Sequence, residues 1–314
     1  MSKVLVTGGA GFIGSHFVSE TLKSIDDVEI TVLDSLTYAG SLTNLKDEID
    51  DITFIQGDIR DFETVQSAVA GVDIVVHFAA ESHNDNSLVN PNIFFETNSF
   101  GTINIANACL AEDTRLHHVS TDEVFGDLPL ESKDRFTATS PYRPSSPYSA
   151  SKASADHIIR SWVRSFGLRA TISNCSNNYG ARQHWEKLIP ATISRLYSGD
   201  KAKIYGDGSN VRDWIHVSDH VAGLWLAIEK GSIGSTYLFG ANDLVSNKDL
   251  VVALAATMGK DESSVEYVED RRGHDRKYAI NPEDTSRELG WSPVYPSVID
   301  HLPDLTAEYL KLLA

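Results

Sequence analysis

Residues 3–22, KVLVTGGAGFIGSHFVSETL, contain a short apolar run, three spaced glycines and then a helical pattern. The apolar run 4–6 predicts a buried strand, because strands covered on both faces show continuous apolar runs. Gly8, Gly11 and Gly14 follow it at three-residue spacing. Beyond them, apolar residues recur at roughly helical intervals. The stretch therefore predicts a strand, a glycine turn and a helix in immediate succession.

An acidic residue completes this pattern. The segment TVLD, residues 31–34, ends in Asp34, twenty residues after Gly14. In the dinucleotide-binding arrangement, glycines allow close backbone approach to a pyrophosphate, the helix N-terminus faces it, and a distal acid bonds the ribose hydroxyls. A glycine turn alone is a weak signal, but here the strand, the helix and the acid all match. Because a carboxylate repels a 2′-phosphate, Asp34 favours NAD over NADP.

Strands continue to alternate with helices through the first half of the chain. Segments 52–58, 73–82 and 115–121 are predicted strands, the first of which ends in Asp58, and residues 98–110 have helical spacing. This alternation predicts an α/β fold with a parallel, doubly wound Rossmann sheet. After Cys175 the alternation becomes irregular, with loops rich in Asn and Gly.

Two adjacent carboxylates, Asp122 and Glu123, directly follow the predicted strand 115–121. They could form a solvated turn, or they could carry acid–base chemistry. Ligands of doubly wound sheets bind outside the carboxyl ends of the strands. The position of the pair therefore favours a chemical role.

Tyr148 and Lys152 lie four residues apart at the start of a segment with helical periodicity, 145–162. This spacing places both side chains on one helix face. An ammonium and the positive nicotinamide ring both favour the phenolate, so a tyrosine with an ordinary pKa of about 10 can act as a base. An exposed pair at a helix start is the alternative. The NAD-binding half that precedes the pair favours the catalytic interpretation.

Together these residues resemble the extended short-chain dehydrogenase/reductase family, and within it the nucleotide-sugar 4,6-dehydratases, above all the members that act on dTDP-glucose. The resemblance extends from Val4 to about Pro293 and rests on the motifs TYAGSL (37–42), FAAESHNDNS (78–87), STDEVFGDL (120–128), SSPYSASKA (145–153), NCSNNYG (174–180), EKLIP (186–190) and NVRDWIHVSDH (210–220). The Thr-Asp-Glu triplet at 121–123 is the most specific of these marks. Related epimerases and decarboxylases share the glycines and the Tyr/Lys pair but lack the Asp-Glu pair.

The resemblance implies a lyase that removes water from a hexose. Tyr148, helped by Thr121 and Lys152, takes the C4 hydroxyl proton while hydride passes to NAD. The resulting 4-ketone acidifies C5–H, which Glu123 removes. Asp122 protonates the departing C6 hydroxyl, and hydride then returns to C6. Two neighbouring carboxyls in opposite protonation states are what such an elimination requires.

The resemblance also implies binding residues. For the cofactor, NAD, these are Gly8, Gly11, Phe12, Ile13, Gly14, Asp34, Thr37, Asp58, Ile59, Ala79, Ala80, Thr97, Ser120, Tyr148, Lys152 and Asn178. For the nucleotide sugar, they are Ser82, Thr121, Asn177, Lys187, Tyr205, Arg212, Asn247, Arg271 and His274. No metal site is expected. Arg212 is expected to be partly buried, whereas Arg276 and Arg287 are expected to be solvated.

These roles suggest a division of the chain. Residues 1–174 are expected to form the NAD-binding Rossmann domain. Residues 175–314 are expected to form mainly a smaller α/β domain that binds the nucleotide sugar, with part of 210–240 returning to the first domain. In the resembling family, helices equivalent to 98–110 and 151–166 pair across a two-fold axis, so a homodimer is expected.

Three loops depart from the family pattern. Val-Asp-Arg is replaced by residues 84–86, Asn-Asp-Asn, and Pro-Tyr-x-Phe-Pro by residues 181–185, Ala-Arg-Gln-His-Trp. Arg-Pro-Gly-His is replaced by residues 271–274, Arg-Arg-Gly-His. None of these changes touches the catalytic triplet, and the last two fall in loops that the family uses around the nucleotide.

Composition excludes several classes of partner. The chain of 314 residues is 41% hydrophobic and 23% charged, with a formal net charge of −17. Such an acidic chain is not expected to bind nucleic acid or an anionic membrane surface. Cys109 and Cys175 are expected to be buried thiols in a reducing compartment. No signal peptide or membrane-spanning run is visible, so a cytoplasmic location is expected.

Three alternatives to the dTDP-glucose assignment remain open. The substrate could be another nucleotide sugar, such as UDP-glucose. The enzyme could be a nucleotide-sugar epimerase or decarboxylase, against which the Asp122–Glu123 pair argues. The chain could be a non-catalytic protein that binds NAD or a nucleotide sugar. A 4-keto-6-deoxy product would distinguish the dehydratase from the last two.

Overall fold

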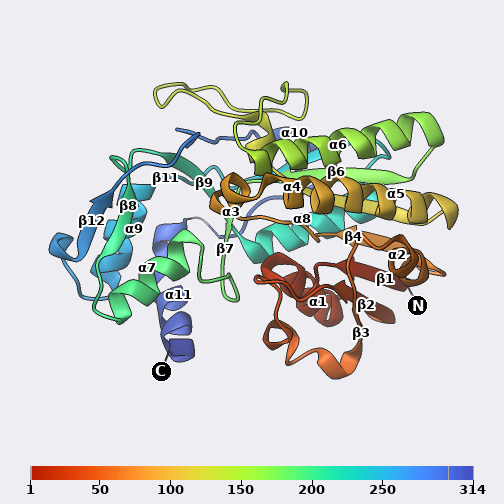
Figure 1. Ribbon diagram of the computed structural model, residues 1–314, viewed down its shortest axis with the longest axis horizontal. Helices are drawn as coiled ribbons and strands as arrows, with labels where there is room; N and C mark the ends of the chain where they lie inside the picture. The colour runs from red at the N-terminus through yellow and green to blue at the C-terminus, as the bar shows by residue number, and fades with distance from the viewer. Residues whose placement is uncertain (1, 296, 314) are drawn as a thin grey trace.

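A seven-stranded, entirely parallel sheet forms the centre of the computed structural model, which describes residues 2–295 and 297–313 (Figure 1). The strand order is β10-β6-β5-β4-β1-β2-β3. The strands are β1 (Ser2–Thr7), β2 (Val28–Asp34), β3 (Ile52–Gln56), β4 (Ile74–His77), β5 (Arg115–Thr121), β6 (Ala170–Cys175) and β10 (Thr236–Phe239). The predicted doubly wound α/β fold is confirmed.

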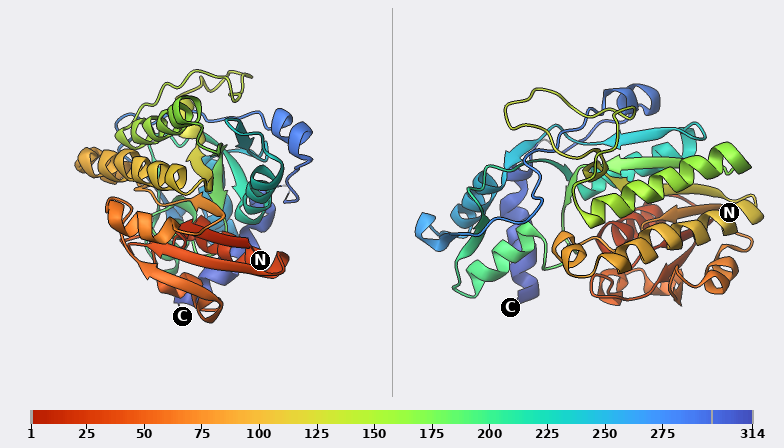
Figure 2. Two further views of the ribbon diagram at one scale, coloured as in Figure 1. Left: turned by 90° about the vertical axis from the view of Figure 1, so that its right-hand side faces the viewer. Right: turned by 45° about the horizontal axis from the view of Figure 1, so that its top comes forward.

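Helices cover both faces of this sheet, as Figure 2 shows from two sides. One layer contains α2 (Phe62–Val69), α5 (Thr102–Ala111) and α6 (Pro147–Phe166), and the other contains α1 (Phe12–Ser24), α8 (Val217–Lys230) and the short α10 (Glu283–Leu289). Successive residues of β1 point to opposite faces. Val4 and Val6 pack in the core with α1 and α8, while Leu5 packs in the core with α2, α5 and α6. This double burial explains the continuous apolar run.

The second half of the chain builds a smaller α/β region, seen in Figure 1 around β8, α9 and α11. It contains a three-stranded sheet, β11-β9-β7, and a two-stranded sheet, β12-β8. The strands are β7 (Asn177–Tyr179), β8 (Ala202–Tyr205), β9 (Val211–His216), β11 (Leu244–Ser246) and β12 (Val265–Val268), and the helices are α7 (Leu188–Tyr197), α9 (Asn247–Thr257) and α11 (Val298–Leu313). Strands of three or four residues carry little periodicity, so the sequence pattern there looked irregular.

The chain returns to the central sheet before it ends. Helix α8 packs against α1, and β10 pairs with β6 to extend the sheet by its seventh strand. Residues 217–239 therefore contribute to the same layers as the first half. The functional division at residue 174 remains a prediction, because the fold alone does not test what each part binds.

The predicted helix 98–110 has a more complex structure. Helices α3 (Asn84–Val89) and α4 (Pro91–Phe94) lead into a π-helix, η3 (Phe95–Gly101), and only then into α5. Short 3-10 turns are η1 (Leu42–Leu45), η2 (Ile49–Asp51), η4 (Asp122–Phe125) and η5 (Glu262–Ser264). Wide π-turns are uncommon and are frequently found at functional sites.

Helix α6 has well-defined ends. Ser146 and Ser149 form a reciprocal capping box at its start, and Gly167, with φ of 77°, ends it in the left-handed conformation. The cap fixes the first turn, which carries Tyr148.

Among the described residues, no helix has both the length and the apolar character needed to cross a membrane. Cys109 and Cys175 are buried free thiols, as predicted.

Candidate active site

The glycine loop lies at the carboxyl end of β1 and leads into α1. Gly8 has φ of +71°, and a Cβ there would lie 2.6 Å from the backbone nitrogen of Ala79. A Cβ on Gly14 would lie 2.3 Å from the carbonyl oxygen of Gly8. The N-cap of α1, Gly11, provides no side-chain hydrogen bond. The first amides of α1 are therefore available for an anionic ligand such as a pyrophosphate.

Asp34 ends β2 beside this loop. Its carboxylate accepts hydrogen bonds from the backbone N–H groups of Ala10, at 2.9 Å, and Leu36, at 2.8 Å. Burial raises the pKa of Asp34, and the two backbone hydrogen bonds oppose that rise. The carboxylate is thus held rigidly at the edge of the cavity, in the position of a ribose acceptor.

A cavity of about 310 Å³ opens along the carboxyl ends of the strands. The structure brings every predicted cofactor residue to its wall, together with the five predicted catalytic residues. They are Gly8, Gly11, Phe12, Ile13, Gly14, Asp34, Thr37, Asp58, Ile59, Ala79, Ala80, Thr97, Ser120, Thr121, Asp122, Glu123, Tyr148, Lys152 and Asn178. A glycine cradle, available helix amides and a fixed carboxylate in one cavity fit a dinucleotide. The assignment of individual contacts remains a proposal.

The Thr-Asp-Glu triplet forms a tight turn at the end of β5. The Thr121 hydroxyl accepts a hydrogen bond from the backbone N–H of Glu123 at 3.3 Å and donates to Asp122 Oδ1 at 3.4 Å. Asp122 is only 1% exposed, so the solvated-turn alternative does not hold for this residue. Burial, followed by the nearby carboxylates Glu123 and Asp213, raises the pKa of Asp122 well above its ordinary value.

Glu123 experiences a more favourable environment for its ionised form. Burial raises its pKa, but a hydrogen bond from Asn84 and the positive charges of Arg212 and Lys187 oppose this rise. The two carboxyls are therefore not equivalent. The pKa of both carboxyls is raised, that of Asp122 more strongly, so Glu123 is the more readily ionised of the two.

Tyr148 and Lys152 both enter the cavity from the first turns of α6. Lys152 Nζ donates to the carbonyl oxygen of Val119 at 2.8 Å, which ties α6 to β5. Burial, followed by the Glu123 charge, raises the pKa of Tyr148 well above its ordinary value, while a hydrogen bond with Thr121 lowers it. The protein groups alone therefore do not produce the lowered phenol pKa that the sequence predicted from the lysine and the nicotinamide charge together.

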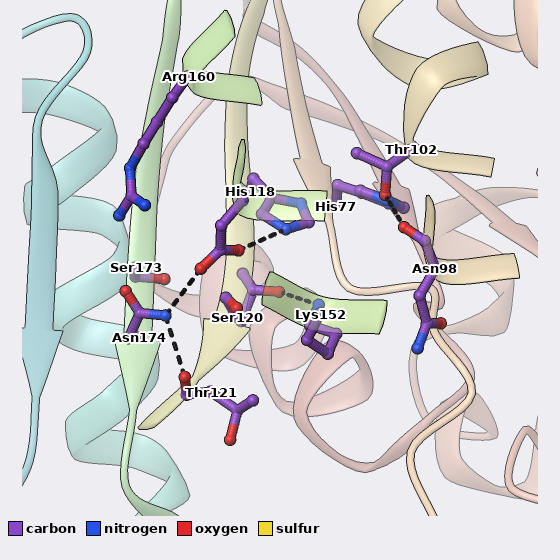
Figure 3. A network of polar contacts seen from close by, with 12 residues as sticks. His77, Asn98, Thr102, His118, Ser120, Thr121, Lys152, Arg160, Ser173 and Asn174 are labelled. Carbon is purple, nitrogen blue, oxygen red and sulfur yellow. Dashed lines mark hydrogen bonds and ion pairs between the residues drawn. The ribbon is translucent and has the colours of Figure 1, made fainter. Parts of the chain in front are cut away.

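A buried polar network lies behind this constellation (Figure 3). Asp156, one helical turn after Lys152, accepts hydrogen bonds from Tyr142 Oη at 2.7 Å and Asn174 Nδ2 at 3.0 Å. Its other oxygen lies 3.2 Å from His118 Nε2. Asn174 Nδ2 also donates to the carbonyl oxygen of Thr121 at 3.0 Å. The network thus joins α6, β5 and β6 next to the turn formed by residues 121–123.

A second cavity of about 400 Å³ adjoins the first and shares Ser82, Glu123, Asn177, Glu186 and Lys187 with it. Apart from Thr121, which lies in the first cavity, every predicted substrate residue lines it. These residues are Ser82, Asn177, Lys187, Tyr205, Arg212, Asn247, Arg271 and His274. The shared wall contains Glu123, so a ligand spanning both cavities would pass the carboxylate pair.

Two arginines are held in place within the second cavity. Arg212 is 7% exposed, which confirms the expectation of burial, and its guanidinium lies 4.2 Å from the ring centre of Tyr278. The Arg271 guanidinium lies 4.3 Å from the ring centre of Tyr205 and pairs with Asp85 at 3.3 Å. Planar guanidinium groups fixed in this way are suited to phosphate recognition.

The atypical loop 181–185 connects the two parts of the molecule. Arg182 reaches back to Glu48 at 3.5 Å and to the carbonyl oxygen of Ser15 at 3.3 Å. Trp185 packs edge-on against Tyr309 of α11, with ring centres 5.3 Å apart. These contacts attach the loop to both regions, so its unusual residues have structural partners.

Sequence reasoning did not identify several polar residues close to the chemistry. Asn84 donates to Glu123, and Asp156, His118 and Asn174 form the buried network. Asp156 could have been recognised from the sequence, because it is an acidic residue one helical turn after Lys152 on a helix face whose other residues are apolar or small. For Asn84, the departure from the family pattern was noted, but its contact joins residues 39 positions apart.

Comparison with known proteins places the chain in a family. The family model described as GDP-mannose 4,6 dehydratase matches residues 5–297. The chain belongs to this family. Within this 4,6-dehydratase family, a relative of similar sequence is the dTDP-glucose 4,6-dehydratase of Mycolicibacterium smegmatis, which is 52% identical over 291 residues, or 93% of this chain and 88% of that protein.

Solved structures agree on the fold. The dTDP-glucose 4,6-dehydratase of Streptomyces venezuelae, solved with NAD bound, matches with a TM-score of 0.95 at 42% identity, covering 98% of this chain and 97% of that one. A UDP-glucose 4-epimerase from Thermotoga maritima matches with a TM-score of 0.91 at 28% identity, covering 99% and 100%. Because epimerases share the 4,6-dehydratase fold, the side chains of the site must distinguish the reactions.

Proposed function

We propose that this protein is an NAD-dependent lyase that converts dTDP-glucose to dTDP-4-keto-6-deoxyglucose. The observation that carries the proposal is the Asp122–Glu123 pair at the junction of two cavities, in which Asp122 is buried, Glu123 is half-buried, and the two carboxyls have unlike environments. An epimerase has no elimination to catalyse and needs no such pair. The names of the relatives with high identity support the same reaction.

The first step is oxidation at C4. Tyr148 takes the C4 hydroxyl proton as the C4–H bond breaks, and Thr121 orients the phenol. Lys152 supplies positive charge from one helical turn away. NAD, when bound, accepts the hydride from C4 and later gives it back, which is redox chemistry that side chains lack. Gly8, Gly14 and Asp34 would hold the bound NAD.

The second step is loss of water. The C4 ketone makes the C5 proton acidic, and Glu123 removes that proton. Asp122, kept protonated by its buried position, donates a proton to the C6 hydroxyl, which leaves as water. Once the hydride has been given back, at C6, Glu123 returns its proton to C5. The proton that Tyr148 took from the C4 hydroxyl balances the one that Asp122 gave up, and its transfer to Asp122 resets the site, so the only net loss is one water molecule. General acid–base catalysis of this kind contributes roughly 10²–10⁴-fold.

Substrate binding would use the second cavity. Arg212 and Arg271 would bind the diphosphate, and Lys187 would lie near the sugar, where its Nζ already donates to the carbonyl oxygen of Ser82 at 2.9 Å. The formal net charge of −17 provides no general attraction for an anion, so these placed cations must supply it. The proposed substrate is dTDP-glucose, and the alternative substrate is UDP-glucose.

A single-turnover experiment tests the proposed roles. Glu123→Gln removes the base while retaining the size of the side chain, so C4 oxidation should proceed and elimination should slow by about 10²–10⁴-fold. Reduced nicotinamide absorbance should persist, and C5–H should not exchange with solvent deuterium. Exchange of C5–H by this variant at the wild-type rate would overturn the role given to Glu123.

Two further variants complete the set. Asp122→Asn retains the base, so C5 exchange should continue while loss of water slows. Tyr148→Phe should block the first step and produce neither reduced nicotinamide nor exchange. A mass spectrum after incubation with a panel of glucose nucleotides identifies the preferred base by loss of water. A 4-epimer without loss of water would instead support the epimerase alternative.

Cofactor retention is a direct consequence of this cycle. Because the hydride returns within the same turnover, NAD need not leave the enzyme. We expect the purified protein to contain NAD, to act without added cofactor, and to respond to NAD rather than NADP. Preference for NADP would contradict the argument from Asp34.

We also propose a homodimer that pairs the η3–α5 segment and α6 across a two-fold axis. Apolar side chains remain exposed on these elements, with Phe100 63% and Phe166 59% exposed. Burying such residues against a second copy would remove them from water. A monomer in sedimentation at micromolar concentration would refute this proposal.

We also propose a cytoplasmic location, since both buried cysteines are free thiols, as is usual in a reducing compartment.

A further inference from the structure

The carboxylate of Glu123 receives a hydrogen bond from the side-chain amide of Asn84. Asn84 Nδ2 donates to Glu123 Oε2 at 2.8 Å, joining the start of α3 to the turn after β5. Its own Oδ1 is buried and has no hydrogen-bond partner within the described chain. A donor bonded to a carboxylate stabilises the ionised form more than the neutral acid.

The backbone of α3 holds this amide in place. Ser87, which is fully buried, donates through Oγ to the carbonyl oxygen of Asn84 at 2.6 Å and through its backbone N–H to that of His83 at 3.1 Å. The next residue, Asp85, pairs with Arg271 at 3.3 Å. Adjacent residues of α3 therefore contact the catalytic carboxylate and the arginine of the second cavity.

We propose that Asn84 is a positioning residue for the elimination step, and that its amide holds the Glu123 carboxylate in place and in its ionised form. The inference rests on the proposed function, in which Glu123 removes the C5 proton. It adds a residue of this chain that makes the two neighbouring carboxyls unequal, because no hydrogen bond joins Asn84 to Asp122 within the described chain.

Several charged or titratable groups face Glu123 and must be considered with Asn84. They are Asp122 on the same turn, Tyr148 on α6, Lys187 before α7, Arg212 on β9, and Asp275 and Tyr278 on the segment that precedes α10. Burial raises the pKa of Glu123, Asp275 adds to that rise, and Asn84, Arg212 and Lys187 lower it. Lys187, Arg212 and Asn84 all line the second cavity. Asn84 is the uncharged donor among these three groups that lower the pKa of Glu123.

An apolar side chain at this position could not donate a hydrogen bond to Glu123. The amide of Asn84 therefore has a defined chemical consequence in this chain. The elimination step should remain active to lower pH than it would with an apolar residue. Removing the donor should raise the pKa of Glu123 and move the acid limb of that step to higher pH.

The test is the pH dependence of elimination in single turnovers of the whole enzyme. Water loss is followed by quenched-flow mass spectrometry, and C4 oxidation is followed separately by reduced nicotinamide absorbance. Asn84→Ala should move the acid limb of elimination upward by about one pH unit, as expected for loss of one charge-assisted hydrogen bond. Asn84→Asp should move it further, because a second carboxylate then faces Glu123.

Asn86→Ala is the matched control. Asn86 lies two residues further along α3, is exposed and lines neither cavity. The acid limb of elimination in the Asn86→Ala variant should therefore stay at the wild-type pH. C4 oxidation at the wild-type rate shows that a variant has folded. Asn84→Val, which removes the donor and keeps most of the side-chain volume, is the second arm and should give the same upward shift.

Two results would overturn the inference in distinguishable ways. If wild-type enzyme eliminates water but Asn84→Ala and Asn84→Val lose rate equally at every pH, with the limb unmoved, Asn84 has only a structural role. If the wild-type enzyme forms no dehydrated product from any glucose nucleotide, the proposed function fails and this inference fails with it.

Discussion

Replacing Asp156 by asparagine tests whether the buried network behind the active site depends on charge. Asp156 is completely buried, and its carboxylate faces His118 Nε2 at 3.2 Å. The Lys152 ammonium, one turn away on α6, is 5% exposed and donates to the carbonyl oxygen of Val119. Asparagine has nearly the same shape and can still accept from Tyr142. The substitution therefore removes mainly the negative charge.

The expected loss can be worked from these contacts. Burial lowers the pKa of His118, so the Asp156 carboxylate is held mainly by hydrogen bonds and by attraction to the Lys152 charge. Loss of a hydrogen bond to a charged group costs about 1.5–3 kcal/mol. Since asparagine retains part of the hydrogen bonding, we expect the free energy of unfolding to fall by about 2 kcal/mol. Asp156→Ala also leaves the buried Tyr142 and Asn174 donors unpaired, which adds about 1–3 kcal/mol for each such group. The predicted order of stability is wild type, then Asn, then Ala.

The pH dependence provides an independent check. Burial acts to raise the pKa of Asp156, but the hydrogen bond and charge of His118, with Lys152 and Tyr142, together lower it below the ordinary value of 3.8. A lowered folded-state pKa contributes stability above the unfolded pKa, and that stability is lost as pH falls through the folded value. The difference between wild type and Asp156→Asn should therefore be constant from about pH 5 upward and shrink below about pH 4.

Urea unfolding followed by circular dichroism measures these differences. Asp113→Asn is the matched control, because Asp113 is 84% exposed and pairs with Arg169 at the surface at 3.6 Å. That change should alter the free energy of unfolding by less than about 0.5 kcal/mol. Equal midpoints for wild type and Asp156→Asn at pH 7 would refute the reasoning, since the buried lysine would then need no compensating carboxylate.

Three further predictions concern other parts of the site. Gly14→Ala should lose bound NAD and about 1–3 kcal/mol of stability, as measured by cofactor absorbance and thermal unfolding, because its Cβ would lie 2.3 Å from the Gly8 carbonyl oxygen. Burial lowers the pKa of His220 from 6.5 to about 3, so folding resists its protonation and stability falls as pH drops below 6.5. His220→Asn removes the imidazole and with it this loss of stability at low pH. The difference in free energy of unfolding between wild type and variant should therefore change by about 1 kcal/mol between pH 7 and 5.5. Arg271→Ala should raise KM for the nucleotide sugar by about 10–100-fold with little change in kcat, whereas an equal fall in kcat at unchanged KM would contradict a binding role.

The amino-acid sequence by itself determined the architecture of the first half. The ends of two strands were predicted too late, since the strands expected to reach residues 58 and 82 end at Gln56 and His77. An apolar run, spaced glycines and a distal acid are local patterns, and the backbone constraints that they satisfy are local too. Asp122 and Glu123 were identified in the same way, because they directly follow a predicted strand. Their roles came from resemblance to a family, and the relatives in that family support the reaction.

Only the tertiary structure placed residues that are distant in sequence against the catalytic turn. Asn84 and Glu123 are 39 positions apart, and Asn174 is 53 positions from Thr121. Periodicity reports which face of an element is buried, but not which side chains of other elements meet it. The short strands β7, β8, β11 and β12 also needed their partners, because three or four residues form a strand only when a neighbouring strand accepts their hydrogen bonds. The contacts that form over these distances give the two neighbouring carboxyls unlike surroundings, which their adjacent places in the sequence could not show.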